Sequence, residues 1–259
     1  MGFTLFYLGL MVLIPIGGMV LKVVHMTWAD FWRYTTTRRA MHAYELTIGA
    51  SLAAAAINAV FGSILAWVLA RYHFPGKRFV DALVDIPFAL PTAVAGLTLA
   101  NLFAPNGWLG KFLTPLGIVG AYSQLGIVIA LTFVSLPFVV RTLQPVIENL
   151  ERETEEAAAT LGAGRLRTFF FVIAPGLFPT LLTGFALSFA RAIGEFGSVI
   201  FISSNIQYKT EIAPLLIFSL LEEFEYNAAM GVAVALLVIS FLLLGSINLI
   251  ERWANRFQT

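Results

Sequence analysis

Two ionisable residues, Arg191 and Glu195, interrupt an otherwise apolar stretch in the C-terminal part of the chain. Charged side chains inside a membrane segment are energetically expensive, and they pair with each other or face a water-filled cavity. Because the two residues are four apart, they share one face of a predicted helix and can form an ion pair. Two interpretations stay open: the pair is structural and locks its helix to the neighbouring helices, or Arg191 lines a pathway and meets an anion in one state.

A second candidate region combines prolines with hydroxyl groups. The string PFALPTAVAGLT, residues 87–98, places Thr92 directly after a proline, and Ser135 begins a similar string, SLPF. Kinked backbone can release amide groups toward a cavity, and the first N–H groups of a helix can bind an anion. Small residues also permit close helix packing. Thr92 and Ser135 are therefore candidates either for lining a pathway or for packing between helices.

Other kinds of site are excluded by what the sequence lacks. The chain has no cysteine, which rules out thiolate metal sites, disulfides and cysteine nucleophiles. Its three histidines have no metal-ligand spacing, and no G-x-x-x-x-G-K-[ST] phosphate loop is present. A net charge of +1 without a basic cluster gives no reason to expect a nucleic-acid partner. We expect no catalytic residue, no metal site and no cofactor in this chain.

The composition places the chain in a membrane. Hydrophobic residues make up 59% and charged residues 12%, whereas soluble domains have about 25% charged residues. A helix of about 20 mostly apolar residues can span a bilayer. The first apolar stretch lacks a charged leader and a cleavage site, so we expect it to be retained. The prediction is an all-α integral membrane protein in contact with lipid, one transmembrane domain over residues 1–259, with six helices at 3–24, 44–70, 84–104, 120–142, 176–204 and 226–250.

Basic residues near the helix ends set the expected orientation. They follow the second, fourth and sixth predicted spans, and such residues favour the cytoplasm. We therefore expect both termini and the loop 144–175 in the cytoplasm. The first loop is also basic and opposes this orientation; its tryptophans, Trp28 and Trp32, suggest a helix lying on the outer membrane surface. The apolar segment 212–221 is too short to cross, so it is predicted to be re-entrant or interfacial.

The loop 144–175 differs from the rest of the chain in being polar. Glutamates dominate its first part, whereas Arg165 and Arg167 come later, an order that suits the dipoles of a helix–turn–helix. Gly162 and Gly164 can supply the bend. The row Ala157–Ala159 leaves a flat helical face that another protein can approach closely. The loop is predicted to be a docking element; a solvated amphipathic loop is the alternative.

The order E-A-A-x-x-x-G, followed after nine residues by Val172-Ile173-Ala174-Pro175, resembles the signature loop of permease subunits of bacterial ATP-driven (ABC) importers. This resemblance implies the ABC importer permease fold and a short helix that docks on a separate ATPase subunit. By this resemblance, the residues that would couple the chain to the ATPase are Glu156, Ala157, Ala158 and Gly162. ATP and Mg²⁺ would be used by the partner, so hydrolysis would occur on another polypeptide.

Four further strings narrow the resemblance: RYHFPGK (71–77), PFALPTAVAGLT (87–98), PFVVR (137–141) and GEFG (194–197). Together they resemble permeases for tetrahedral oxyanions of the molybdate and sulfate type. Three of the patterns are shared with molybdate permeases, but the string containing Thr92 is most similar to T-type permease subunits of sulfate/thiosulfate importers. Import of sulfate, and also thiosulfate, is thus implied, with molybdate or tungstate import as the alternative.

The same resemblance implies an assembly in a bacterial plasma (inner) membrane. Its other members would be a second, related permease subunit in a heterodimer, two ATPase subunits, and a periplasmic or extracellular sulfate-binding protein. Two alternatives from other classes of membrane protein also stay open. One is a membrane scaffold that does not transport; the other is a secondary transporter in which Glu195 couples to an ion gradient.

Overall fold

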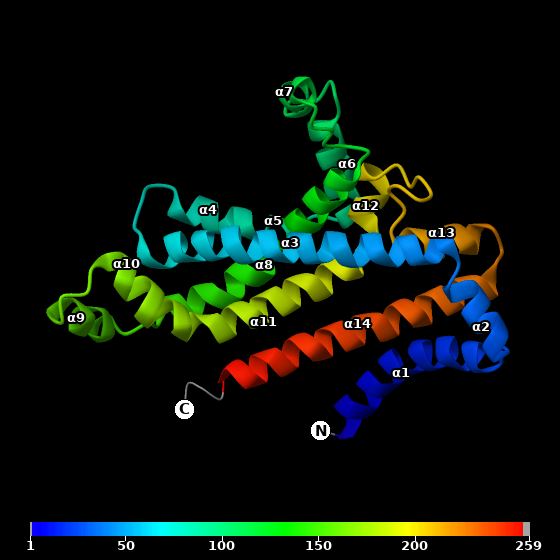
Figure 1. The fold of residues 1–259 in the computed structure, drawn as a ribbon, viewed down its shortest axis with the longest axis horizontal. Helices are drawn as coiled ribbons and strands as arrows, with labels where there is room; N and C mark the ends of the chain where they lie inside the picture. Colours follow the sequence, from blue (N-terminus) through cyan, green and yellow to red (C-terminus); the bar gives the residue numbers. More distant parts are fainter. Residues whose placement is uncertain (1, 256–259) are drawn as a thin grey trace.

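A computed structural model describes residues 2–255, and this part of the chain is helical throughout, without a strand. Figure 1 shows long helices lying roughly side by side, with shorter helices at both ends of the bundle. The long helices are α1 (Gly2–Val24), α3 (Arg38–Arg71), α8 (Gln124–Glu148), α11 (Ala174–Ile193) and α14 (Tyr226–Asn255). The short ones are α2 (Trp28–Thr35), α4 (Lys77–Val84), α5 (Ile86–Ala89), α6 (Thr92–Phe103), α7 (Gly110–Leu113), η1 (Thr114–Leu116), α9 (Arg152–Thr160), α10 (Arg165–Thr168), η2 (Phe169–Ile173), α12 (Gly197–Ile202) and α13 (Ala213–Glu222).

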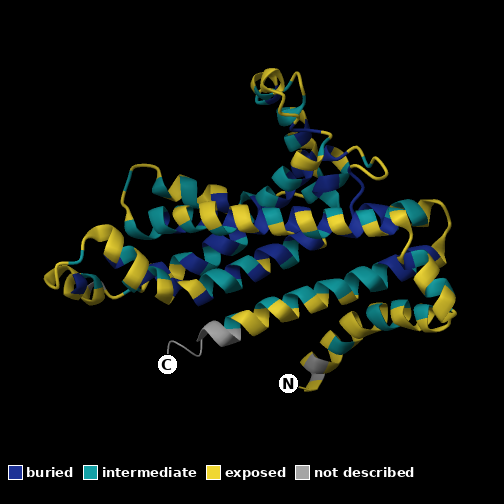
Figure 2. Ribbon diagram, in the orientation of Figure 1, coloured by how far each residue is buried: buried dark blue, intermediate teal, exposed yellow. Residues whose placement is uncertain are grey.

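The core of the bundle is formed by α3, α8 and α11, which pack against one another. Buried residues concentrate on their facing sides, whereas α1 and the outer side of α14 are largely exposed (Figure 2). The helices α3 and α8 run in the same direction. Their starts are close together, because His42 near the start of α3 and Gln124 at the start of α8 line one small cavity. Their ends are also close, because α9 follows the end of α8 and forms an ion pair with the end of α3.

A polar cluster lies inside this apolar core. The amide nitrogen of Asn58 on α3 donates to the carbonyl oxygen of Thr132 at 3.1 Å and to the hydroxyls of Ser135 on α8 at 2.9 Å and Ser188 on α11 at 3.2 Å. Asn58, Ser135 and Ser188 are fully buried. Since hydrocarbon offers no hydrogen-bond partner, these groups must bond within the protein. The cluster therefore ties the three core helices together.

An ion cluster holds α4 against the side of α8. The guanidinium of Arg141 on α8 donates to Asp81 at 2.7 Å and to both carboxylate oxygens of Asp85 at 2.7 and 2.8 Å. It also donates to the carbonyl oxygen of Asp81 at 2.8 Å. A planar guanidinium with several fixed donors suits this bridging. As a result, the chain segment that leaves the end of α3 returns along the core helices.

Five helical segments of the described chain are long and apolar enough to cross a bilayer: Phe6–Val24, Arg38–Arg71, Gln124–Glu148, Arg165–Ile193 and Tyr226–Glu251. The third predicted span, 84–104, is not among them and is wrong as a single helix. It is divided into α5 and α6 at Leu90 and Pro91, both of which have extended backbone conformations. The residue before a proline is disfavoured in the α conformation, which accounts for the break. In Figure 1, α6 leaves the bundle at a steep angle.

Other predicted boundaries also need correction. The span 176–204 ends as a helix at Ile193, and the chain is irregular over 194–196 before α12 begins. The span 120–142 starts at Gln124, because the Ser123 hydroxyl caps the helix by accepting from the N–H of Gly126 at 3.1 Å, and it continues to Glu148. The loop 144–175 is consequently mostly helical, consisting of the end of α8, then α9, α10 and η2.

The segments outside the core follow the sequence-based expectations more closely. The aromatic part of the first loop forms α2, where Trp28 stacks on Phe31 and Trp32 meets both rings edge to face, with ring centroids 5.6–5.9 Å apart. The Thr27 hydroxyl caps this helix by accepting from the N–H of Asp30 at 3.2 Å. The short apolar segment forms α13, which packs between α3 and α14.

Replacement of Asn58 by alanine tests the polar cluster. The variant removes the donor shared by three oxygens on α8 and α11, so we expect it to lower the free energy of unfolding by about 1–2 kcal/mol. Thermal unfolding in detergent measures the change. The matched control is Asn101→Ala, because the exposed Asn101 amide bonds only to Leu97 on its own helix. Equal melting temperatures for the two variants would contradict a structural role for the cluster.

Candidate functional site

The predicted docking helix is present as α9, at one end of the bundle and away from the core (Figure 1). Glu156 and Ala157 are exposed on it, whereas Ala158 is turned inward and buried. Glu156 forms no ion pair with any described side chain. The four predicted coupling residues therefore do not share one face: Glu156 and Ala157 are available to another protein, and Ala158 packs α9 onto its own chain.

Gly162 ends α9 in a left-handed conformation, with φ of +80°. The N–H of Gly162 donates to the Ala159 carbonyl at 3.0 Å, and the N–H of Ala163 donates to the Ala158 carbonyl at 3.0 Å. This pattern satisfies carbonyl groups at the helix end, and glycine adopts the required backbone without steric cost. The turn leaves Leu161 88% exposed at its tip. A large apolar side chain beside Glu156 and Ala157 adds to the surface offered to a partner.

The sequence did not reveal what anchors α9 to the bundle. Arg71, the last residue of α3, donates through Nη2 to the Glu155 carboxylate on α9. The Arg71 guanidinium also lies over the Trp67 ring, 5.4 Å from its centroid. The two paired residues are 84 positions apart, so no local pattern predicts their contact. The available signal was a basic residue that closes a predicted span, in a chain whose loop 144–175 is acidic in its first part.

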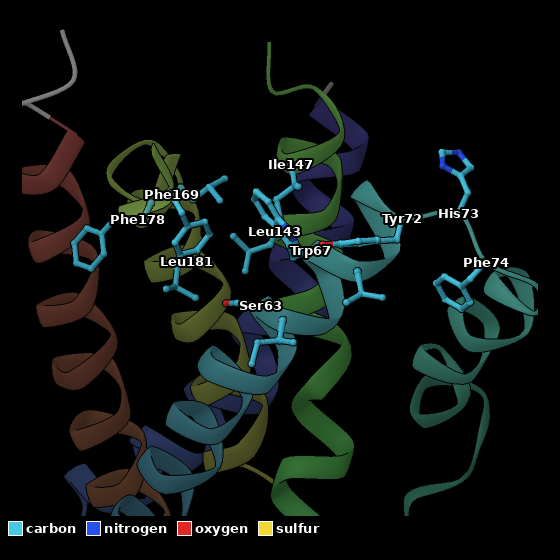
Figure 3. Close-up of a pocket in the computed structure, with 14 residues that line it drawn as sticks. Ser63, Trp67, Tyr72, His73, Phe74, Leu143, Ile147, Phe169, Phe178 and Leu181 are labelled. Atoms are coloured by element: carbon cyan, nitrogen blue, oxygen red, sulfur yellow. The ribbon is translucent and has the colours of Figure 1, made fainter. Parts of the chain in front are cut away.

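An apolar cavity of about 630 Å³ lies beside this anchor, between α3, α8 and α11 (Figure 3). Trp67 lines it from α3 and Tyr72 from just after the end of α3, Leu143 and Ile147 line it from α8, and Phe178 lines it from α11. Phe169 of η2 also lines it, and its ring meets Trp67 edge to face with centroids 5.4 Å apart. The cavity thus separates parts of the bundle at the end where α9 is attached.

Arg191 and Glu195 form the predicted ion pair, but not because they share one face of a helix. Glu195 does not lie on the same helix as Arg191, because α11 ends at Ile193. One Glu195 carboxylate oxygen accepts from Arg191, and the other accepts from the N–H of Ser198 at 2.9 Å and from its hydroxyl at 3.0 Å. The Glu195 side chain is 3% exposed and that of Arg191 is 31% exposed. The carboxylate joins the end of α11 to the first turn of α12, where a negative charge is favoured.

Thr92 lies at the crossing of α6 and α12. A Cβ atom at Gly197 would be 2.2 Å from the Thr92 hydroxyl, and a Cβ atom at Gly96 would be 2.2 Å from the carbonyl oxygen of Ser198. The two glycines therefore permit a backbone approach that any side chain would block. Thr92 faces Gly197 at the start of α12. Glu195 bonds to Ser198 in the same turn and pairs with Arg191, so the three predicted residues lie in one region.

Ser135 is placed elsewhere. Its hydroxyl accepts from Asn58 and donates to the Leu131 carbonyl at 2.6 Å, and the residue is fully buried in the helix core. The structure thus brings Thr92, Arg191 and Glu195 to the beginning of α12 and separates Ser135 from them. Within residues 2–255, no three His, Cys, Asp or Glu side chains gather in a way that could hold a metal ion.

Comparison with known proteins places the chain among transporters. A sulfate transport system permease protein, CysT, from Synechocystis sp. is 50% identical over 254 residues, which cover 98% of this chain and 89% of the relative. CysT from Salmonella typhimurium is 50% identical over 251 residues, covering 97% and 91%. CysT from Escherichia coli is 49% identical over the same length. The similarity extends over nearly the whole of each protein.

Solved structures share the fold at low sequence identity. A crystal structure of a bacterial ABC transporter that imports the acidic polysaccharide alginate matches with a TM-score of 0.79 at 15% identity, covering 96% of this chain and 92% of the other. The same type of transporter in complex with its alginate-bound periplasmic protein gives 0.77 at 17% identity, with coverage of 96% and 91%. The likeness confirms the ABC permease fold.

The model of a single family covers residues 58–257, from the middle of α3 to the C-terminal region. This range contains the C-terminal part of α3, the core helices α8 and α11, the helix α9 and the start of α12. The chain belongs to the family of binding-protein-dependent transport system inner membrane components.

Proposed function

We propose that the chain is a permease subunit of an ATP-driven importer that carries sulfate, and also thiosulfate, across the bacterial inner membrane. The observation that carries this proposal is the identity of about half of all residues, over nearly the full length, to proteins named as sulfate transport permeases. The string containing Thr92 led to the same substrate. Molybdate or tungstate import is disfavoured, because the relatives at this level of identity are sulfate permeases.

The proposed partners are a second, related permease, two ATPase subunits and an external sulfate-binding protein. The family description, which names binding-protein-dependent transport, supports a binding protein, as does the neighbouring structure in complex with its periplasmic protein. The exposed surface of Glu156, Ala157 and Leu161 supports docking of an ATPase at α9. ATP and Mg²⁺ would be bound and used by that ATPase.

The proposed topology has six crossings with both termini in the cytoplasm. Its support is the parallel arrangement of α3 and α8: the chain ends α3 beside α9 and must return to the opposite end before it begins α8. The segment from α4 to α6 makes this return, so α5 and α6 together form the third crossing as a broken segment. Broken segments of this kind line cavities in transporters, because their free backbone groups need polar surroundings.

Coupling follows from the position of α9 in the chain. It is joined to α8 on one side and, through α10 and η2, to α11 on the other, and both are core helices. A movement of α9 with the ATPase would therefore be passed to two helices of the permease core. This subunit would act as the gate, while the hydrolysis of ATP takes place on its partner.

For the polar residues we propose two different roles. The Arg191–Glu195 pair is structural at the break between α11 and α12, since both Glu195 oxygens have partners within the chain. Ser135 belongs to the core cluster with Asn58. Thr92, at the first turn of α6 after the Pro91 break, remains the proposed pathway residue, because the free N–H groups of a helix start can meet an anion.

Sulfate uptake tests the substrate and the energy source together. Cells lacking their own sulfate importer receive this chain with its partners, and radiolabelled sulfate uptake is measured. We expect uptake that requires ATP and resists excess molybdate. If excess molybdate abolishes the uptake of labelled sulfate, the chain would instead be assigned to molybdate import. Uptake that follows an ion gradient and ignores nucleotide would instead favour a secondary transporter, and a failure of substrate to stimulate ATP hydrolysis would favour a scaffold.

Glu156→Lys tests the docking surface. Reversal of the charge on an exposed residue should leave the permease folded but should disturb its contact with the ATPase, so we expect uptake to fall about 10-fold or more, equivalent to about 1.4 kcal/mol. Uptake and copurification of the ATPase are measured together. Glu222→Lys, at the end of α13 on the other side of the bundle, provides the control. Unchanged uptake in Glu156→Lys would remove this residue from the coupling surface.

Removal of the Arg191–Glu195 pair distinguishes the two roles considered for it. Glu195→Ala leaves the partly exposed Arg191 without its partner and the N–H of Ser198 without its acceptor, so we expect a loss of about 1–3 kcal/mol in stability and poor assembly. The double variant Arg191→Ala with Glu195→Ala should recover part of that loss. The amount of assembled complex and the melting temperature measure the effect. A double variant that assembles fully yet transports nothing would show that Arg191 serves the anion pathway.

A further inference from the structure

One ion pair joins the docking helix to the only core helix that does not flank it in sequence. The end of α8 and the start of α11 are connected to α9 through the chain, whereas α3 is not. Arg71 at the end of α3 reaches α9 by donating to Glu155. The Arg71 side chain is 18% exposed and that of Glu155 is 35% exposed, so the pair is partly shielded from water. Such shielding strengthens an ion pair relative to one on an open surface.

The Arg71 guanidinium is held in place by an aromatic base. It lies over the Trp67 ring at 5.4 Å, and Trp67 in turn meets the ring of Phe169, which begins η2. Arg71, Trp67, Glu155 and Phe169 therefore form one group, which we name the α3 joint. It brings the end of α3 into contact with both the helix α9 and the segment through which the chain returns to α11. A cation over an aromatic face is favourable and fixes the direction of the side chain.

The 630 Å³ cavity lies directly beside the joint, and Trp67 and Phe169 both line it (Figure 3). Packed protein interiors resist the movement of large side chains because few voids exist in them. At this position, however, the two rings border open space. On the side that borders the cavity, these two rings are therefore not packed against the core formed by α3, α8 and α11.

We propose that Arg71 is a positioning residue that couples α9 to α3, so that displacement of α9 moves all three core helices together. This inference rests on the proposed function, in which α9 receives the motion of an ATPase. Arg71 acts through Glu155 and touches neither substrate nor nucleotide. Without the pair, motion of α9 would reach α8 and α11 through the chain but would leave α3 behind.

Charge reversal tests the proposal in the complete importer reconstituted in lipid vesicles. Arg71→Glu and Glu155→Arg each place like charges at the joint, and the double variant restores opposite charges in exchanged positions. We expect each single variant to raise the ratio of ATP hydrolysed to sulfate transported by about 3-fold or more, in line with the coupling of residues in direct contact. The double variant should return the ratio to within about 2-fold of the parent. Arg78→Glu, an exposed cation on α4 without an ion pair in the described chain, is the control for charge alone.

A second measurement does not depend on sulfate. The chain has no cysteine, so spin labels can be attached specifically at His73→Cys, just after α3, and Glu153→Cys, on α9. Pulsed EPR on the assembled importer then reports the distance between α3 and α9. The distribution should be narrow in the parent, broad in each single variant, and narrow again in the double variant. A purely structural contribution to overall stability would not produce this reciprocal recovery.

The results separate this inference from the proposed function. Single variants that keep the parent ratio and the parent distance distribution would overturn it, as would a double variant no better than the worse single variant. An effect of Glu155→Arg without an effect of Arg71→Glu would also overturn it, because Glu155 would then act on the ATPase itself. If the parent assembly hydrolyses ATP but takes up no sulfate, the substrate assignment fails, whereas the distance measurement still decides the role of the joint.

Discussion

A polar donor inside a bilayer has to find its hydrogen-bond partners within the protein, and in this chain the fully buried amide nitrogen of Asn58 does so. Its donors reach α8 and α11 from α3, and these three helices form the core on which the other elements are assembled. The relative direction of α3 and α8 then requires the chain between them to return along the bundle. The broken segment α4–α6 and its attachment through Arg141 are consequences of that requirement.

Charged residues in the rest of the bundle follow the same constraint, because they gather where helices begin, end or break. Glu195 bridges the break between α11 and α12, and Arg71 joins the end of α3 to α9. Arg39, near the start of α3, binds Glu211 before α13 through two hydrogen bonds of 2.7 and 2.8 Å. Each ion pair thus holds a junction between otherwise rigid helices. The molecule consists of stiff apolar rods whose possible movements are limited by a small number of polar contacts.

Sequence reasoning succeeded where a segment is uniform and failed where distant segments meet. Hydropathy alone identified the continuous helices α1, α3, α8 and α14, and the glycine turn at Gly162 followed from local backbone chemistry. Near Pro91 the prolines indicated a kink but not a division into two helices, and near Gly194 the charged residues Arg191 and Glu195 were placed on one helix although the helix ends between them. Ser135 was a candidate for a pathway or for helix packing because of its Ser-Leu-Pro-Phe string, and its bond to Asn58, 77 positions away, could not be read from that string. The Arg71–Glu155 contact was beyond reach for the same reason. Motif resemblance supplied the family, since the docking helix is encoded in one short stretch.

The wide helical turn η2 affects the geometry of the segment that leads from α9 to α11. There the N–H of Ala174 bonds to the carbonyl of Phe169, five residues earlier, next to Pro175, whose ring nitrogen has no hydrogen to donate. One residue more than a regular turn rotates the helix faces on its two sides by about 100° relative to each other. Leu166 before the turn and Phe170 within it face outward, while Leu177 after it faces the core. This phase shift changes which side of the segment between α9 and α11 is turned toward the core.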